Sequence, residues 1–238
     1  MRMRRVVLLA LVLALAWAAG AEAGQAPRMI LALGSTNWLN RGDIQAATGA
    51  LVKQDLEQYQ LKDVRVVVLG NIAFGSLPGP VQQGLVEYVS AGGTLLITGG
   101  SQSFGSGGYQ AVPSIIPFEI RSDNDWRAIP FRPPLVLQPG HPMMAGVTFI
   151  TVGVVNDMNP RSGALEILQA AGGGSAAGRV AGRGGGSFQY PLIAEVRAGS
   201  GQVIGVAMDL NDFAGMPDLP LFVRNTILYL ANVSRMGQ

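Results

Sequence analysis

The sequence predicts an α/β protein built on a doubly wound, mostly parallel β-sheet. In the first half of the chain, short Val- and Leu-rich runs alternate with segments of helical periodicity. The apolar runs show little polar alternation, which is typical of strands buried on both faces of a parallel sheet. The 238 residues are 48% hydrophobic and 13% charged, a composition that suits a globular domain with a sizeable core.

The first half of the chain predicts strands and helices in strict alternation. The expected strands are residues 28–33, 64–69 and 94–98. The expected helices are residues 43–61 and 78–91. Asp43 is the predicted N-cap of the first helix, and Gly92 and Gly93 are predicted to end the second. Strand, helix, strand, helix, strand at this spacing indicates a parallel sheet with helical crossovers.

The second half of the chain is less regular. Short strands are expected at residues 118–120, 135–137, 152–155 and 164–170. Two longer runs predict a hairpin at residues 192–197 and 202–208, followed by a C-terminal helix at residues 219–233. The segment 172–187 holds eight glycines in sixteen residues and is expected to form a flexible loop within the domain.

The N-terminus has the three-part layout of a secretory signal peptide. Arg2, Arg4 and Arg5 are followed by an apolar run at 6–19 and by a small-x-small site at 21–23. The run is shorter than the roughly 20 residues that span a bilayer. We therefore expect residues 1–23 to be a signal peptide and residues 24–238 an exported domain, periplasmic or extracellular. The alternative is an uncleaved anchor, in which case the protein would contact the membrane.

Composition excludes several classes of function. The formal charge of +2 and the pI of 9.2 come from the N-terminal arginines, and beyond residue 23 basic and acidic residues are equal in number. A nucleic-acid partner, which needs a clustered basic face, is therefore not expected. The absence of Cys excludes thiolate zinc, iron–sulfur clusters, disulfides and a cysteine nucleophile. With one His in the chain, no bound metal is expected.

The glycine cluster at 99–108 resembles a phosphate-binding loop only superficially. A P-loop needs Lys directly after its second anchor glycine. Gly100 and Gly105 have the required spacing, but Ser106 follows them. The glycines after the third strand also do not follow the dinucleotide pattern G-x-G-x-x-G. No nucleotide or other cofactor is therefore expected.

Small polar residues follow the predicted parallel strands. In open α/β sheets the ligand crevice lies at the carboxyl ends of the strands. The candidate ligand-binding residues there are Ser35, Asn37, Asn71, Ser101 and Ser103. Asp209 and Asn211 follow the last strand. The same residue types also suit plain turns and helix caps, so this alternative stays open.

Ser101 lies in a partial nucleophile elbow. The pattern G-x-S-x-G matches residues 99–102, and Ser103 replaces the last glycine. Ser101 would need a general base, and His141 is the one imidazole of the chain. Ser101 and His141 are thus weak catalytic candidates, and they define a serine-hydrolase alternative acting on a carbohydrate or an ester.

Three segments resemble the putative glutamine amidotransferase domain, a branch of the class I glutamine amidotransferase-like superfamily. They are the glycine-rich run 92–109, the His-Pro segment 141–147 and the Gly-x-Gly-x-Val strand at 199–203. The resemblance covers nearly all of residues 29–233. It implies a flavodoxin-like sheet with helices on both faces. It also implies a protein partner at the cell envelope, because members of this branch are found attached to membrane-anchored proteins.

The chain departs from this superfamily at the nucleophile. Active members carry Cys at the elbow and His with an acid near the C-terminus, whereas here Ser101 occupies the elbow and the last third has no His. Glutamine amide transfer is therefore excluded, because that chemistry needs a thiolate. We expect an exported, non-catalytic binding or interaction module, a pseudoenzyme. Besides the serine hydrolase, a further alternative is a sugar-binding protein resembling the trehalose-utilisation proteins of the same superfamily.

Overall fold

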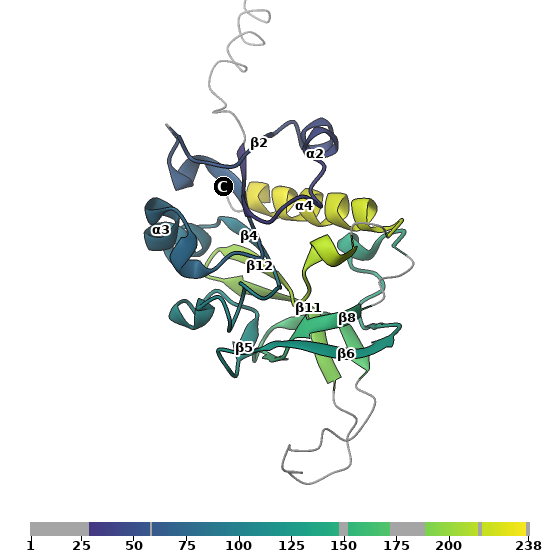
Figure 1. Ribbon diagram of the computed structural model, residues 1–238. Coiled ribbons are helices and arrows are strands. Elements are labelled where there is room, and N and C mark those ends of the chain that lie inside the picture. Colours follow the sequence, from purple (N-terminus) through teal and green to yellow (C-terminus); the bar gives the residue numbers. More distant parts are fainter. Residues whose placement is uncertain (1–28, 58, 148–151, 172–188, 214–215, 237–238) are drawn as a thin grey trace, which may run out of the picture.

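An eight-stranded sheet forms the centre of the protein (Figure 1). The computed structural model describes residues 29–57, 59–147, 152–171, 189–213 and 216–236. The predicted signal peptide at residues 1–23 and the glycine-rich segment 172–187 lie outside these residues, so both stay predictions. Within the described chain, no helix is long and apolar enough to cross a membrane.

The sheet has the strand order β2-β1-β3-β4-β12-β11-β10-β7. Its strands are β1 (Met29–Gly34), β2 (Leu51–Lys53), β3 (Val64–Gly70), β4 (Thr94–Thr98), β7 (Leu135–Val136), β10 (Leu165–Ala171), β11 (Gln189–Ala198) and β12 (Gly201–Val206). The first five neighbours pair in parallel, and β11, β10 and β7 extend the sheet in antiparallel pairing. The parallel part has the flavodoxin-like order 2-1-3-4-5. The predicted fold class is confirmed.

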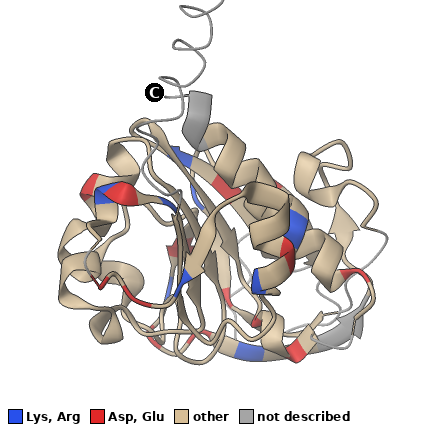
Figure 2. Ribbon diagram, turned by 90° about the horizontal axis from the view of Figure 1, so that it is seen from above, with Lys and Arg blue, Asp and Glu red and all other residues tan. Residues whose placement is uncertain are grey.

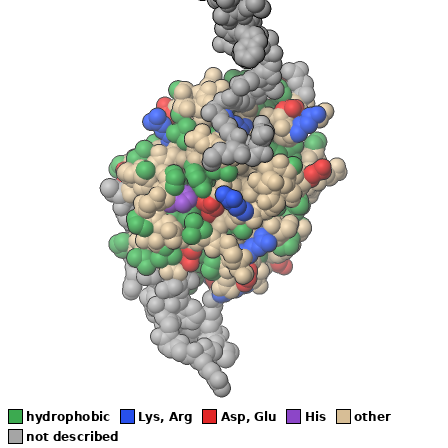
Figure 3. All heavy atoms as spheres, turned by 180° about the vertical axis from the view of Figure 1, so that it is seen from behind, with side chains coloured by type: hydrophobic (Ala, Val, Ile, Leu, Met, Phe, Trp, Pro, Cys, Tyr) green, Lys and Arg blue, Asp and Glu red, His purple; other side chains and the backbone are tan. Residues whose placement is uncertain are grey.

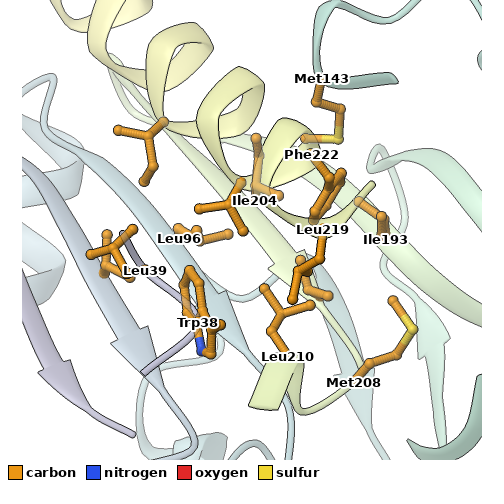
Figure 4. Close-up of a cluster of buried hydrophobic side chains, with 14 of the residues drawn as sticks. Trp38, Leu39, Leu96, Met143, Ile193, Ile204, Met208, Leu210, Leu219 and Phe222 are labelled. Atoms are coloured by element: carbon orange, nitrogen blue, oxygen red, sulfur yellow. The ribbon is translucent and has the colours of Figure 1, made fainter. Parts of the chain in front are cut away.

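Helices cover both faces of the sheet. They are α2 (Arg41–Thr48), α3 (Gly79–Ser90) and α4 (Leu219–Met236). On one face, α2 and α4 pack against alternate residues of the strands, and Figure 4 shows Leu219 and Phe222 of α4 directed toward Leu96 and Ile204. On the other face, α3 and the segment 104–118 pack against the intervening residues. This alternation explains why the parallel strands read as continuous apolar runs.

In the described part of the chain, five short 3-10 turns link these elements. They are η1 (Leu61–Asp63), η2 (Phe74–Ser76), η3 (Tyr109–Ala111), η4 (Pro142–Met144) and η5 (Leu210–Phe213). Two of them flank regions that matter below: η4 packs on α4, and η5 directly follows the end of β12.

The first predicted helix is much shorter than its periodicity indicates. It ends at Thr48, because Gly49 adopts a left-handed conformation with φ 68° and caps it. The chain then forms β2, which pairs with β1 at the sheet edge. The N-cap is Asn40 rather than Asp43: the Asn40 side chain accepts a hydrogen bond from the Asp43 backbone N–H at 3.2 Å.

Two antiparallel ribbons lie beside the main sheet. They are formed by β5 (Phe118–Ile120) with β9 (Met158–Pro160), and by β6 (Trp126–Arg132) with β8 (Val152–Asn156). The sequence predicted β5 and β8 but not their partners. Arg127 and the proline at position 130 interrupt the apolar pattern of β6, so this strand depends on pairing with β8 rather than on its own periodicity.

Candidate functional site

Four parallel strands end at the same level of the sheet. Gly34 of β1 is in register with Gly70 of β3, which is in register with Thr98 of β4, which pairs with Val206 of β12. The segments that follow these strands therefore meet at one edge, as the sequence predicts. This edge is where open α/β sheets bind ligands.

The backbone closes the gap between β1 and β3, where the strand order reverses. The Ser35 N–H donates to the Gly70 carbonyl at 2.6 Å. A Cβ atom at Gly70 would collide with the carbonyl of Ser35, and one at Gly34, where φ is 80°, would collide with the Gly70 carbonyl. Glycine is needed at both positions for this close approach. The backbones that follow β1 and β3 are therefore in direct contact at the switch point.

Four side chains join the loops that follow the strands, and we call Ser35, Asn71, Asp209 and Asn211 the carboxyl-end network. Asn71 donates from Nδ2 to Asp209 Oδ2 at 2.7 Å. The other oxygen of Asp209 accepts from Asn211 Nδ2 at 2.7 Å and from the Asn211 backbone N–H at 2.9 Å. Asn211 Nδ2 also donates to Ser35 Oγ at 3.0 Å. Two of the predicted ligand residues, Ser35 and Asn71, thus bind other parts of the chain.

The turn after β4 is held by Asn156 at the end of β8. Asn156 is fully buried, accepts from the Gly100 N–H at 2.9 Å and donates to the Gly100 carbonyl at 3.2 Å. The left-handed conformation at this turn falls on Gly100, where φ is 136°, and not on Ser101. The strained position of a nucleophile elbow is therefore a glycine here. Sequence reasoning missed Asn156, because no local pattern links it to a turn 56 residues away.

The glycine cluster after this turn holds an internal carboxylate instead of a phosphate. Asp125, 1% exposed, accepts from the backbone N–H groups of Gly105 and Ser106 at 3.0 Å each, and from Ser106 Oγ at 2.9 Å. Backbone N–H groups in such a loop bind anions readily, and here they are already engaged. Asp125 therefore fixes the loop that carries Ser101.

The other predicted ligand residues differ in exposure. Asn37 and Ser101 are exposed, and neither side chain hydrogen-bonds another described residue. Ser103 is 1% exposed, and its hydroxyl has no partner in the described part of the chain. Asn37 and Ser101 can thus contact a ligand, whereas the Ser103 hydroxyl does not reach solvent.

Trp126 adds an aromatic side chain to this edge. It is half-buried on β6, directly after Asp125, and it is in register with Asn156 of β8. Residues directly opposite each other in an antiparallel pair project from the same face. The indole therefore projects on the side on which Asn156 holds the Gly100 turn. The sequence contains this Trp, but only the strand register places it at the site.

His141 lies on the α4 face of the sheet and does not meet Ser101. Its Nε2 is 2.8 Å from Glu195 Oε2, its Nδ1 accepts from the Met143 N–H at 3.3 Å, and its ring stacks edge-on against Tyr229 at 4.8 Å. Figure 3, which shows the molecule from behind, has the histidine side chain in purple on this face. Both ring nitrogens are engaged, so the pair that the serine-hydrolase alternative needs is not formed.

Glu195 is the centre of a second polar group, the α4-face cluster, which consists of His141, Glu195, Gln202 and Tyr229. The Tyr229 hydroxyl donates to Glu195 Oε1 at 3.1 Å and accepts from Gln202 Nε2 at 2.9 Å; Gln202 Nε2 also hydrogen-bonds Glu195. Burial raises the pKa of Tyr229, so its hydroxyl stays a donor at neutral pH. This cluster joins the β11–β12 hairpin to α4.

The charges at the two sites carry no sign of a metal centre. Among the described residues, no group of three or more His, Asp or Glu side chains is placed to hold a metal ion. In the view of Figure 2, basic and acidic residues are interspersed over the ribbon. At the carboxyl-end network, partial burial and then the nearby Asp209 carboxylate raise the pKa of Asp212.

Comparison with known proteins finds similar folds but no similar sequence. No protein-family model and no curated protein matches the sequence. Solved structures do match: the cytoplasmic protein STM3548 from Salmonella typhimurium is 14% identical with a TM-score of 0.62, covering 85% of this chain and 98% of that chain. A ThuA-like protein from Parabacteroides merdae is 13% identical with a TM-score of 0.53, covering 86% and 90%.

A larger protein matches over one part of its length. The β-galactosidase from Rahnella sp. R3 is 12% identical with a TM-score of 0.52, covering 88% of this chain and 31% of that chain. Together these likenesses show that the chain shares its fold with ThuA-like proteins and with one part of a β-galactosidase. At these identities the likeness concerns the fold alone.

Proposed function

We propose that this protein is a non-catalytic carbohydrate-binding domain whose ligand binds over Trp126, Ser101 and Asn37. The fold is shared with ThuA-like proteins and with a part of a β-galactosidase, which favours a sugar ligand over an unrelated small molecule. The sequence resemblance to trehalose-utilisation proteins favours the same ligand class.

The observation that carries the proposal is the register of Trp126 with Asn156, the residue that holds the turn immediately before Ser101. A sugar ring has an apolar C–H face and a rim of hydroxyls. The negative face of an indole attracts C–H groups of partial positive charge. The Ser101 hydroxyl and the Asn37 amide can donate to and accept from sugar hydroxyls, and both are exposed. One aromatic face with a few hydrogen-bonding groups is a common way to hold a polar ligand on a preformed surface.

The surroundings of Ser101 favour binding over catalysis. A serine nucleophile requires a base within hydrogen-bond reach. The imidazole of His141 is engaged with Glu195 and Met143, and Ser101 hydrogen-bonds no described residue. Export through residues 1–23 and a partner at the cell envelope stay part of this proposal. N-terminal sequencing of the protein from culture medium or periplasm would show whether the mature chain begins at Gly24.

Trp126→Ala tests the sugar site. We expect the unsubstituted protein to bind a disaccharide, with trehalose and lactose as probes, and Trp126→Ala to lose at least tenfold in affinity because the stacking face is gone. Ser101→Ala should lose only a few-fold. Isothermal titration calorimetry measures both, and the tryptophan fluorescence should change on binding in the parent and in Ser101→Ala but not in Trp126→Ala.

Two controls make this test specific. Trp126→Phe keeps an aromatic face and should retain most of the affinity, and Arg127→Ala changes the next residue of β6, which projects from the opposite face. Unchanged affinity in Trp126→Ala would contradict the proposal, as would the absence of binding to every sugar tried. Ester or glycoside turnover that disappears in Ser101→Ala would favour the hydrolase instead.

A further inference from the structure

A cavity of about 630 Å³ lies between α2 and α4. The two helices pack side by side on one face of the sheet (Figure 1). Its lining residues are Trp38, Asn40, Asp43, Ile44, Ala46, Ala47, Pro217, Pro220, Leu221, Val223 and Arg224. The volume lies within the range of small-molecule sites, roughly 300–1,000 Å³. Neither Ser101 nor Trp126 lines it.

Most of the lining is apolar. Trp38, Ile44 and Val223 are buried and belong to the core on the α4 face. The Trp38 indole N–H donates to the Ser35 carbonyl at 3.1 Å, which fixes the orientation of the ring. The small side chains of Ala46 and Ala47 leave the space between the helices unfilled. A ligand here would gain from burying apolar atoms against a preformed surface.

Two opposite charges lie on opposite walls of this cavity. Asp43 comes from α2 and Arg224 from α4, and both side chains are exposed. Neither forms an ion pair or a side-chain hydrogen bond with another described residue, and the two do not pair with each other. The carboxylate and the guanidinium are therefore both available to a ligand.

We infer that this cavity binds a zwitterion with an apolar body, either an apolar α-amino acid or a short apolar peptide. The ligand carboxylate would bind Arg224, whose planar guanidinium matches a carboxylate in two parallel hydrogen bonds. The ligand ammonium would bind Asp43. The apolar part would lie on Ala46, Pro220 and Leu221, which line the cavity and keep accessible surface. A purely anionic ligand would meet the carboxylate of Asp43, and a purely cationic one would meet Arg224.

The test measures the binding of leucine and of leucyl-leucine to the full chain by isothermal titration calorimetry. The two probes share their chemistry and differ in the separation of their charges, so they distinguish the free amino acid from the peptide. N-acetyl-leucine lacks the ammonium, and leucinamide lacks the carboxylate. We expect at least one zwitterion to bind, and each truncated analogue to bind at least tenfold more weakly.

Matched variants connect each ligand charge to one residue. Asp43→Asn should bind the zwitterion more weakly than the parent does. Because its partner for the ammonium is gone, this variant should bind leucine and N-acetyl-leucine with similar affinity. Arg224→Gln lacks the partner for the carboxylate, so this variant should bind leucine and leucinamide with similar affinity. Arg41→Gln, on α2 but outside the cavity lining, and Asp55→Asn are controls of equal charge change and should bind as the parent does. Circular dichroism melting of each variant checks that it is folded.

Several outcomes would overturn the inference. They are the absence of binding by both zwitterions, tight binding of N-acetyl-leucine that Asp43→Asn does not change, and equal losses in the control variants. Trehalose binding that is lost in Arg224→Gln but kept in Trp126→Ala would make the cavity the sugar site, and both proposals would then be wrong. Loss of sugar binding in Trp126→Ala with zwitterion binding intact would support two separate sites.

Discussion

The carboxyl-end network and the α4-face cluster are two polar groups with different compositions. The carboxyl-end network surrounds one carboxylate, Asp209, with amide donors, and it joins loops that follow parallel strands. The α4-face cluster surrounds Glu195 with an imidazole, a phenol and an amide, and it joins an antiparallel hairpin to a helix.

The difference follows from where each half of the sheet exposes polar groups. Parallel strands leave their polar residues in the loops beyond the strand ends, where backbone N–H and C=O groups also need partners. The antiparallel hairpin instead carries Glu195 and Gln202 within its strands, on the face that α4 covers. The first arrangement bonds backbone groups as well as side chains, since Asn71 Oδ1 accepts from the Gln102 N–H and Asn211 Nδ2 donates to the Ser35 carbonyl, whereas the second consists mainly of bonds between side chains. Truncation should therefore cost most near the strand ends.

The largest effect is expected for Asn156→Ala. This change leaves the buried Gly100 N–H without an acceptor, and it removes one donor to the Gly100 carbonyl. Because an unsatisfied buried group is costly, we expect a loss of about 3 kcal/mol in the free energy of unfolding. Urea unfolding measures it. Asn159→Ala, on the neighbouring strand β9 and half-buried, is the control and should change little.

A smaller effect is expected for His141→Leu. The change removes a hydrogen bond from the buried carboxyl group of Glu195. We expect a loss of about 2 kcal/mol, because a buried polar group is then left partly unpaired. The double variant His141→Leu with Glu195→Gln should recover part of this loss, since the amide removes the carboxylate that lost its partner and keeps an oxygen acceptor for Tyr229 and Gln202. A double variant less stable than the single one would contradict this view of the α4-face cluster.

The smallest effect is expected for Asp212→Asn, and it depends on pH. The pKa of Asp212 is raised in the fold above its ordinary value of 3.8, first by partial burial and then by Asp209. The folded protein therefore binds more protons than the unfolded chain just above pH 3.8, and stability falls as pH rises through the folded pKa. Asp212→Asn should melt slightly higher than the parent at pH 7 and equally at pH 3. A reversed order at pH 7 would show that the Asp212 carboxylate is stabilised instead.

The parallel core was predictable because its signals are local. Each residue of β3 is buried, so its Val-rich run needs no knowledge of its partners. The helix α3 also agrees with its periodicity and with its glycine stop. The helix α2 is shorter than predicted because Gly49 can adopt a left-handed conformation, and the edge of β1 was free to pair with β2. Local periodicity did not reveal that the residues after Thr48 would form a strand instead of continuing the helix.

The candidate site was predictable only in part. The convergence of strand ends brought Ser35, Asn71 and Ser101 to one edge, as parallel topology requires. Their roles were not predictable, because the partners that decide them are distant in sequence: Asn211 reaches Ser35 across 176 residues. The position of Trp126 at this edge likewise depends on the register of β6 with β8.

The sequence by itself determined the fold class of this protein and excluded chemistry that needs a cysteine nucleophile. Apolar runs and glycine stops specify a parallel α/β core, and a chain without Cys cannot form a thioester. Only the tertiary structure decided that His141 serves Glu195 rather than Ser101, and that Asn156 holds the Gly100 turn. The physical reason is that apolar periodicity is a property of neighbouring residues. A hydrogen bond between side chains instead requires two distant segments to meet in one geometry.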